Sequence, residues 1–270
     1  MSLTRQATRA RRLTGELVSR SGLEQDALSR SGSQHRSHYW PDSSPHSAAF
    51  AARFPDSERL IAMARLAVVR NYQFWHPWHM EPTHAPEKAV NRKRYISVRT
   101  GDPEWTHALL RFSHLFDLAA AYALTQERCF VEACFDELLD YATVRISRSG
   151  GAILHNQLDA ALRVHNLVRA HDLIASGGDI PSELPDLMEA IARSDCRFLA
   201  DNLGKRVGNW EFFISSALLV AGGYFSDWVE SSSHTERAGR RLTEILATEI
   251  SGDFVEIEEA PMYSGECILT

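Results

Sequence analysis

The sequence predicts an all-α protein built from successive antiparallel helical hairpins. Apolar residues recur at helical spacing after residue 52, and strand-like alternation is almost absent before residues 253–257. Short connections between the expected helices force neighbouring helices to run antiparallel. Each expected pair takes about 45 residues, a repeat length typical of helical solenoids and toroids. We therefore expect one helical domain over residues 53–270.

Residues 1–52 differ from the rest of the chain in composition. They are rich in Ser, Arg and His, with Ser-Gly and Ser-Pro breaks, and predict a basic leader in a loop or disordered conformation. Leu13, Leu17 and Val18 are expected to form one short amphipathic turn. The segment lacks the apolar region of a secretory signal. Read literally, this favours the cytoplasm, although a removed signal would look the same, so the location stays unassigned.

The first expected helix covers Glu58–Tyr72, with Asp56 or Ser57 as its N-cap. Asp102-Pro103-Glu104 is typical of a second helix start, with a cap acceptor, a proline and then an acid. This helix is expected to run past Tyr122 and to break near Thr125-Gln126. A helix that contains Phe130 and Tyr141 is expected next, and then one at about residues 157–175. Pro181-Ser182 and Pro185 lead into another that ends near Gly204, and two more are expected at about residues 211–225 and 235–250.

The segment Phe74–Pro82 is dense in aromatic residues and histidines. His76, His79 and His84 lie close together, but their spacing matches no metal-binding helix motif, and the prolines oppose a regular helix. We expect an aromatic loop that packs on the core or lines a sugar-binding cleft. No metal and no cofactor are expected in this protein.

Composition excludes several classes of protein. The chain has 270 residues, of which 44% are hydrophobic and 24% charged, as in an ordinary globular protein. Its net charge of -6 does not favour nucleic-acid binding. No run of about 18 apolar residues predicts a membrane span. The four cysteines lack metal-binding spacing, and we expect Cys129 and Cys134 to be packed thiols.

Four segments, in order, resemble the N-terminal helical domain of the heparinase II/III-like polysaccharide lyases, which include related alginate lyases. The resemblance covers about residues 100–264. The segments are Asp102–Trp105 leading into Leu110–Thr125, Leu158–Asn166, Gly208–Glu211 and Asp253–Tyr263.

This resemblance implies a partial (α/α) toroid with a substrate cleft across one face. It also implies an acidic polysaccharide or oligosaccharide as substrate, such as a glycosaminoglycan or alginate that contains uronic acid. Family members cleave by β-elimination, in which the C5 proton is removed and the C4 oxygen leaves. No nucleic acid or membrane partner is implied.

The resemblance assigns catalytic roles to Asn209 and Tyr263. An amide stabilises the enolate-like charge that develops beside the uronate carboxylate. A phenol serves as base, or as acid to the leaving oxygen, when nearby cations lower its pKa from about 10. The residues expected to bind substrate are Arg163, Asn166, His165, Glu258 and Trp210. Among these, Arg163 is the expected bidentate partner of the uronate carboxylate.

Simpler explanations exist for three of these residues. Asn209 follows a glycine at a helix start, where an asparagine serves as N-cap without any catalytic role. Tyr263 is alternatively a half-buried aromatic residue with its hydroxyl in water. Arg163 is alternatively a surface arginine paired with Asp159 at i,i+4.

Other histidines and tryptophans are expected to be structural. His114 lies on a largely apolar helix face, which favours a core or cleft-wall histidine. Trp105 and Trp228 are expected in the core. On architecture alone, a paired-carboxylate glycosidase using Asp159 or Glu258 stays open.

The sequence departs from the family pattern in ways that support a second function. Trp210 and Ser264 stand where family members often have histidine, and no β-sandwich follows the helical part. We therefore weigh a lyase domain against a non-catalytic helical module, a fragment or degenerate relative, that binds acidic glycan or a partner protein. An apolar toroid edge left uncovered would favour self-association.

Overall fold

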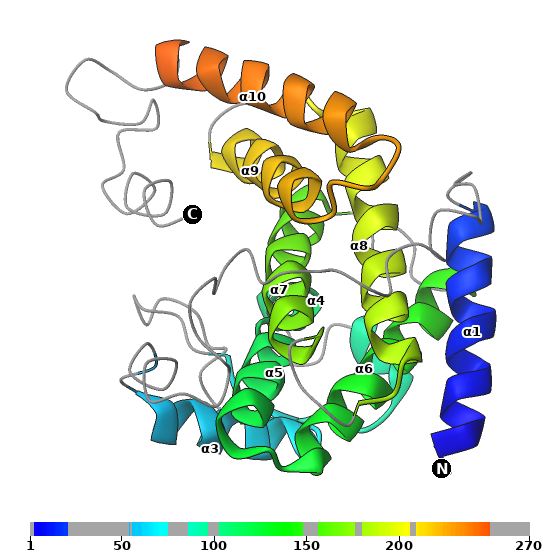
Figure 1. Cartoon of the computed structure of the whole chain (residues 1–270). Helices are drawn as coiled ribbons and strands as arrows, with labels where there is room; N and C mark the ends of the chain where they lie inside the picture. The colour runs from blue at the N-terminus through cyan, green and yellow to red at the C-terminus, as the bar shows by residue number, and fades with distance from the viewer. Residues whose placement is uncertain are drawn as a thin grey trace.

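The computed structural model describes residues 3–20, 54, 56–74, 86–96, 103–147, 156–175, 180–205 and 209–248. Nearly all the regular structure in these ranges is helical, which confirms the all-α prediction (Figure 1). The predicted helix at 157–175 agrees with the structure at both ends. Residues 253–257, the one predicted stretch of strand-like alternation, lie outside the described ranges.

The helices form hairpins arranged in two rows (Figure 1). The inner row packs side by side and consists of α5 (Ser113–Thr125), α7 (Gln157–Ala175) and α9 (Asn209–Tyr224). The outer row consists of α6 (Arg128–Ile146), α8 (Glu183–Asn202) and α10 (Ser231–Thr248). The helix α3 (Ser57–Val68) packs on α5 at one end of the inner row. One apolar core joins both rows.

The inner helices run parallel to one another, because each is separated from the next by one antiparallel outer helix. Two contacts between α7 and α9 show the register. His165 pairs with Ser216 at 2.7 Å, and His171 pairs with Tyr224 at 3.0 Å further along both helices. The N-terminal ends of α7 and α9 therefore lie at the same edge of the domain. The helix α5 begins further along α7, where Asn166 bonds to the Arg111 carbonyl.

The N-terminal helix α1 (Leu3–Arg20) corrects the sequence prediction for this part of the leader. Instead of one short turn, 18 residues are helical and pack on α6 and α8. Leu13, Leu17 and Val18 are buried, as are Ala10 and Gln6. The Ser/Arg-rich composition suggests a loop, but tertiary packing of the amphipathic face decides the outcome. Residues 21–52 lie outside the described ranges, so their assignment as leader stays a prediction.

The helix α3 ends at Val68, four residues earlier than the sequence predicts. Arg70 has a left-handed backbone with φ of 55°, which stops the helix. Residues 71–72 then form a two-residue strand, β1, which pairs antiparallel with β2 (Glu87–Lys88). The predicted continuation of the helix to Tyr72 is therefore wrong.

The long helix predicted from residue 103 is divided in two. The first part, α4 (Pro103–Leu110), ends before Phe112, whose φ of 65° breaks the helix and starts α5. The Phe112 ring is buried, and it lies 4.8 Å from the ring of Tyr141 and 5.6 Å from the Arg163 guanidinium. Packing of this ring compensates for the unfavourable backbone conformation. The break near Thr125-Gln126 is confirmed, with Gln126 left-handed at φ 61°.

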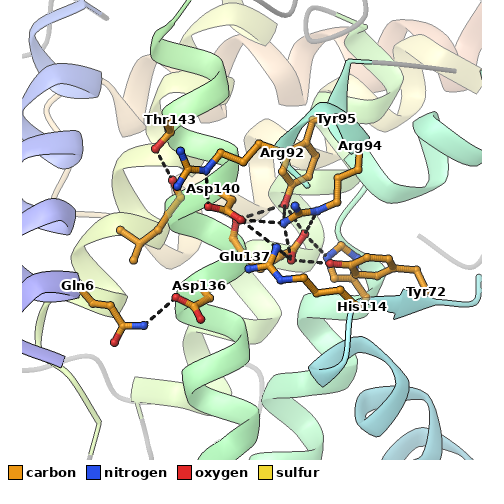
Figure 2. A network of polar contacts seen from close by, with 12 residues as sticks. Gln6, Tyr72, Arg92, Arg94, Tyr95, His114, Asp136, Glu137, Asp140 and Thr143 are labelled. Carbon is orange, nitrogen blue, oxygen red and sulfur yellow. Dashed lines mark hydrogen bonds and ion pairs between the residues drawn. The ribbon is translucent and has the colours of Figure 1, made fainter. Parts of the chain in front are cut away.

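A buried polar network on α6 joins the strand β1 and the 3-10 helix η3 (Arg92–Tyr95) to the hairpins (Figure 2). Glu137 accepts hydrogen bonds from Tyr72 at 2.7 Å, from Arg94 at 3.0 Å and from Tyr95. Burial alone would raise the pKa of Glu137, but His114 at 3.5 Å and the Arg94 guanidinium hold it well below its usual range.

One turn along α6, Asp140 extends the network to the surface and to α1 (Figure 2). It accepts from Arg92 at 2.7 Å and from Arg70 at 2.9 Å, and lies 3.5 Å from Arg9 of α1. Figure 2 also shows Gln6 of α1 bonded to Asp136, at 2.7 Å. The network therefore fixes α1 to the outer row.

The residues expected in the core lie there. His114 is 4% exposed, among the rings of Tyr72, Phe74 and Phe112. Trp105 and Trp228 are also buried. Cys129 and Cys134 are unbridged thiols, as predicted.

Candidate functional site at the edge of the inner row

The inner row exposes one stripe of α7. This helix packs against α8, α5 and α9 on three sides, which leaves a fourth side uncovered by them. Between residues 158 and 169, the half-exposed side chains recur three or four positions apart and so share one face: Leu158, Leu162, His165, Asn166 and Arg169. Two predicted substrate-binding residues, His165 and Asn166, therefore lie on this stripe.

His165 is a neutral member of the stripe. Its Nε2 lies 2.7 Å from the Ser216 hydroxyl of α9. Burial, reinforced by the positive charge of Arg169, lowers the pKa of His165 to about 4. At neutral pH the ring therefore carries no charge, and a role in substrate binding stays a prediction.

Asn166 faces the turn between α4 and α5. Its side-chain amide donates to the Arg111 carbonyl at 2.9 Å. This bond fixes the start of α5 against α7. A role in substrate binding stays a prediction for Asn166, whose side chain is half-buried.

Arg163 lies in the core, on a different side of α7 from the stripe. It is fully buried, and its guanidinium contacts Asp195 of α8 at 2.8 and 3.2 Å and the Leu110 carbonyl at 2.7 Å. The alternative of a surface arginine paired with Asp159 is wrong, because the buried partner is Asp195. Binding of a uronate carboxylate by Arg163 stays a prediction, and in this conformation the guanidinium is already bonded on two sides.

Asn209 and Trp210 open α9 at the N-terminal edge of the inner row. Asn209 is 8% exposed, and Trp210 is half-buried. Ser216 of α9 lies beside His165 of α7, and the two helices run parallel with the same rise per residue. Seven residues before this contact, Asn209 of α9 is therefore level with Leu158 of α7. The predicted catalytic asparagine therefore lies beside the first turn of α7. Tyr263 and Glu258 lie outside the described residues, as do His76, His79 and His84.

A cluster that sequence reasoning did not find borders the same edge. Asp159, in the first turn of α7, is buried, and its carboxylate contacts His107 Nδ1 at 2.5 Å and Arg111 Nε at 3.0 Å. Glu104 of α4 lies 3.4 Å from Arg111. The hydrogen bond to Asp159 raises the pKa of His107, against the opposing effect of burial. The cluster therefore contains a partly exposed imidazole whose raised pKa favours the protonated, positively charged form.

The sequence carries only part of the signal for this cluster. Asn156 caps α7, since its side chain accepts from the Asp159 backbone N–H at 3.1 Å. His107 and Arg111 are four residues apart, as expected for neighbours on one helix face. No pattern relates them to Asp159, about fifty residues later, because the contact is made by packing of α4 on α7.

A second charged group lies further along the stripe. The Arg169 guanidinium stacks 3.9 Å from the centre of the Phe116 ring of α5. Burial raises the pKa of the adjacent Asp117 to about 7, against the opposing charges of Arg169 and Arg59. This end of the stripe therefore combines an aromatic ring with titratable and cationic groups.

Two other kinds of site are absent from the described ranges. No group of three or more potential metal ligands occurs there. None of the described helices has the length and apolar character needed to cross a membrane.

The arrangement of hairpins places the domain in the class of (α/α) toroids, and comparison with solved structures supports this. The chain superposes on heparan sulfate lyase HepC from Pedobacter heparinus with a TM-score of 0.65 and 18% identity, covering 88% of this chain and 36% of that one. It superposes on a heparinase III with a TM-score of 0.67 and 16% identity, covering 94% and 40%. A comparison with curated proteins found no match.

A family model described as "Heparinase II/III N-terminus" matches residues 50–269. The chain therefore belongs to the heparinase II/III family, as its motifs suggest, and carries a polysaccharide lyase-like domain. It spans less than half the length of the structures that it matches.

Proposed function

We propose that this domain forms part of a polysaccharide lyase that cleaves a uronic-acid-containing acidic polysaccharide by β-elimination. The observation that carries the proposal is the position of Asn209, at the edge of the inner row and level with the start of α7. Family membership and the heparan sulfate lyase and heparinase III structures with the same fold support the substrate class.

The reaction assigns a simple task to Asn209. Its amide donates a hydrogen bond to the uronate carboxylate, which lowers the cost of charge that develops when the C5 proton leaves. The C5–H bond breaks, a C4–C5 double bond forms, and the bond from C4 to the glycosidic oxygen breaks. Tyr263 is the proposed proton carrier, taking the C5 proton or returning one to the leaving oxygen.

The exposed stripe of α7 offers several groups suited to sugar binding. His165 and Ser216 offer neutral hydrogen-bonding groups, and Trp210 offers a half-exposed ring. Arg169, stacked on Phe116, offers a cation for a carboxylate or sulfate further along the chain of sugars. Arg163 and Asn166 act in this proposal mainly by holding α7 against the α4–α5 turn and α8.

The test is an assay of the chain with heparan sulfate and with alginate, following the ultraviolet absorbance of the unsaturated uronate product. The gene's complete product is assayed in parallel. We expect Asn209→Ala to lower kcat by about 10²–10³-fold, as for loss of one oxyanion donor. Arg240→Gln, on the outer helix α10, serves as a control that keeps full activity.

Two results would overturn the lyase proposal. One is the absence of unsaturated product from every polymer with the complete gene product. The other is an Asn209→Ala variant as active as the parent. Glycan binding without cleavage would instead favour the non-catalytic module.

A further inference from the structure

We propose that His107, oriented by Asp159, is a substrate-contacting residue that donates a hydrogen bond to a carboxylate or sulfate oxygen of the glycan, so that binding weakens as the pH rises. This rests on the proposed function for its natural ligand. Its geometric basis is the His107–Asp159–Arg111 cluster at the N-terminal edge of the inner row.

The hydrogen bond to Asp159 fixes which ring nitrogen faces outward. A buried carboxylate at 2.5 Å from Nδ1 accepts its proton, so Nδ1 is the protonated nitrogen in both charge states. The His107 side chain is 18% exposed, against 2% for Asp159. Nε2 is therefore the nitrogen that gains or loses a proton, and it is a donor only when the ring is charged.

The cluster is held rigidly enough to position the ring. Asp159 sits in the first turn of α7, capped by Asn156. Arg111 is fixed by its side-chain bond to Asp159 and by the bond from Asn166 to its carbonyl. These contacts tie α4, which carries His107, to α7 from two directions, so little side-chain freedom remains to be lost on binding.

The cluster lies beside the proposed reacting edge. Asp159 directly follows Leu158, the residue level with Asn209. His107 contacts α7 through Asp159, and Asn209 is level with Leu158, so both residues lie at the first turn of α7. A glycan lying across this edge meets both residues.

The charged groups that face His107 make anion binding depend on whether its ring is protonated. Asp159 of α7 and Glu104 of α4 are negative, and Arg111 is positive. With His107 charged, these four groups sum to zero, and with His107 neutral they sum to one negative charge. The cluster therefore accepts an anionic oxygen below the pKa of His107 and repels it above. Because Asp159 raises that pKa, the transition is shifted upward from the ordinary value of histidine.

The experiment is nuclear magnetic resonance of the imidazole nitrogens of the chain, titrated with pH alone, with glucuronate and with inorganic sulfate. The spectrum of His107→Asn identifies the signal. We expect a saturable shift of the His107 Nε2 signal and a further rise of its pKa on anion binding. Glucuronate and sulfate distinguish the two kinds of anionic group. His165, already neutral near pH 7, should not change its charge state.

Matched variants sharpen the result. His107→Asn should lower affinity for a heparan sulfate oligosaccharide about tenfold below the transition and remove the pH dependence. Glu104→Gln removes the facing negative charge and should strengthen binding several-fold. Glu236→Gln, the same change on the outer helix α10, should leave affinity unchanged.

The outcomes separate this inference from the proposed function. If neither anion shifts the His107 signal at any pH, the inference is overturned whether or not the protein is a lyase. A shift at His107 in a protein that forms no unsaturated product would support the inference while contradicting the lyase proposal. Circular dichroism of each variant verifies that it is folded.

Discussion

Two clusters in this domain use the same residue types and differ in burial. On α6, Glu137 is surrounded by Arg94, Tyr72, Tyr95 and His114, all buried (Figure 2). On α7, Asp159 is also buried, but its two partners are half-exposed, His107 at 18% and Arg111 at 21%. Every group that donates a hydrogen bond to Glu137 is enclosed, and its partly exposed cation, Arg70, lies further away at 3.7 Å. At Asp159 both hydrogen-bonding partners reach solvent.

The difference shows that a buried carboxylate does not by itself indicate a functional site. At Glu137 the hydrogen-bond donors Tyr72, Arg94 and Tyr95 are enclosed, so these bonds serve to fix β1 and η3 on α6. At Asp159 the carboxylate holds groups that retain access to ligand. The exposure of the partners, more than the pKa of the carboxylate, distinguishes the two roles.

The largest expected effect is the loss of folding stability when the central carboxylate of each cluster is replaced by its amide. Glu137→Gln removes the nearer of the two carboxylates that face the buried Arg94, with Asp140 left at 3.3 Å, and should lower the free energy of unfolding by about 3–5 kcal/mol. Asp159→Asn should cost less, about 1–3 kcal/mol, because water reaches His107 and Arg111. Urea denaturation measures both. Equal losses would show that the two clusters are alike in burial.

The second expected effect is on the pH dependence of the free energy of unfolding. Glu137 and His107 contribute to it with opposite signs. The pKa of Glu137 is lowered on folding, so its contribution is present above the unfolded value of about 4.3 and is lost as the pH falls. The pKa of His107 is raised, so its contribution is present below about 6.5 and is lost as the pH rises through the folded value.

Urea midpoints of the parent, Glu137→Gln and His107→Asn across the pH range test these signs. The difference between parent and Glu137→Gln should shrink in acid. The difference between parent and His107→Asn should shrink in base. A difference that does not vary with pH would rule out the corresponding pKa shift.

A third prediction compares two neighbouring glycines of α9, one packed against α10 and one with open space beside it. A Cβ on Gly222 would lie 2.4 Å from the Thr235 hydroxyl of α10, whereas a Cβ on Gly223 meets nothing within 4 Å. Gly222→Ala should therefore cost about 1–3 kcal/mol. Gly223→Ala should stabilise by about 0.4–1 kcal/mol. Thermal denaturation compares them, and a harmless Gly222→Ala would mean that α10 shifts easily.

The smallest effect concerns the neutral histidine of the stripe. His165→Asn should cost about 1 kcal/mol for the hydrogen bond to Ser216. Since the pKa of His165 is about 4, this cost should not vary with pH above about 5. Denaturation at several pH values measures it, and a dependence near neutrality would show that His165 carries charge there.

Much of the fold could be predicted from the sequence, because helix periodicity and turn residues are local signals. The helix at 157–175 and the break at Gln126 are examples. The errors arose where distant contacts override local preference. Packing on α6 and α8 stabilises α1, and the buried ring of Phe112 stabilises a left-handed residue that no glycine marks.

The candidate site was less accessible to sequence reasoning. His165 and Asn166 share an exposed face because they follow helix periodicity. Arg163 is on the same helix but faces Asp195, and only the placement of α8 reveals that. The contact between His107 and Asp159 depends on how α4 crosses α7, for which one sequence contains no local signal.

The parallel direction of α5, α7 and α9 has an electrostatic consequence. Each helix carries a macrodipole with roughly half a positive charge at its N-terminus, and the effect fades beyond the first turn. In an antiparallel bundle the dipoles of adjacent helices cancel, but within this inner row they point the same way. The edge that holds Asn209 and Asp159 therefore gathers the positive ends of α9 and α7. The backbone itself thus makes this edge attractive to a polyanion, in a protein whose net charge is -6.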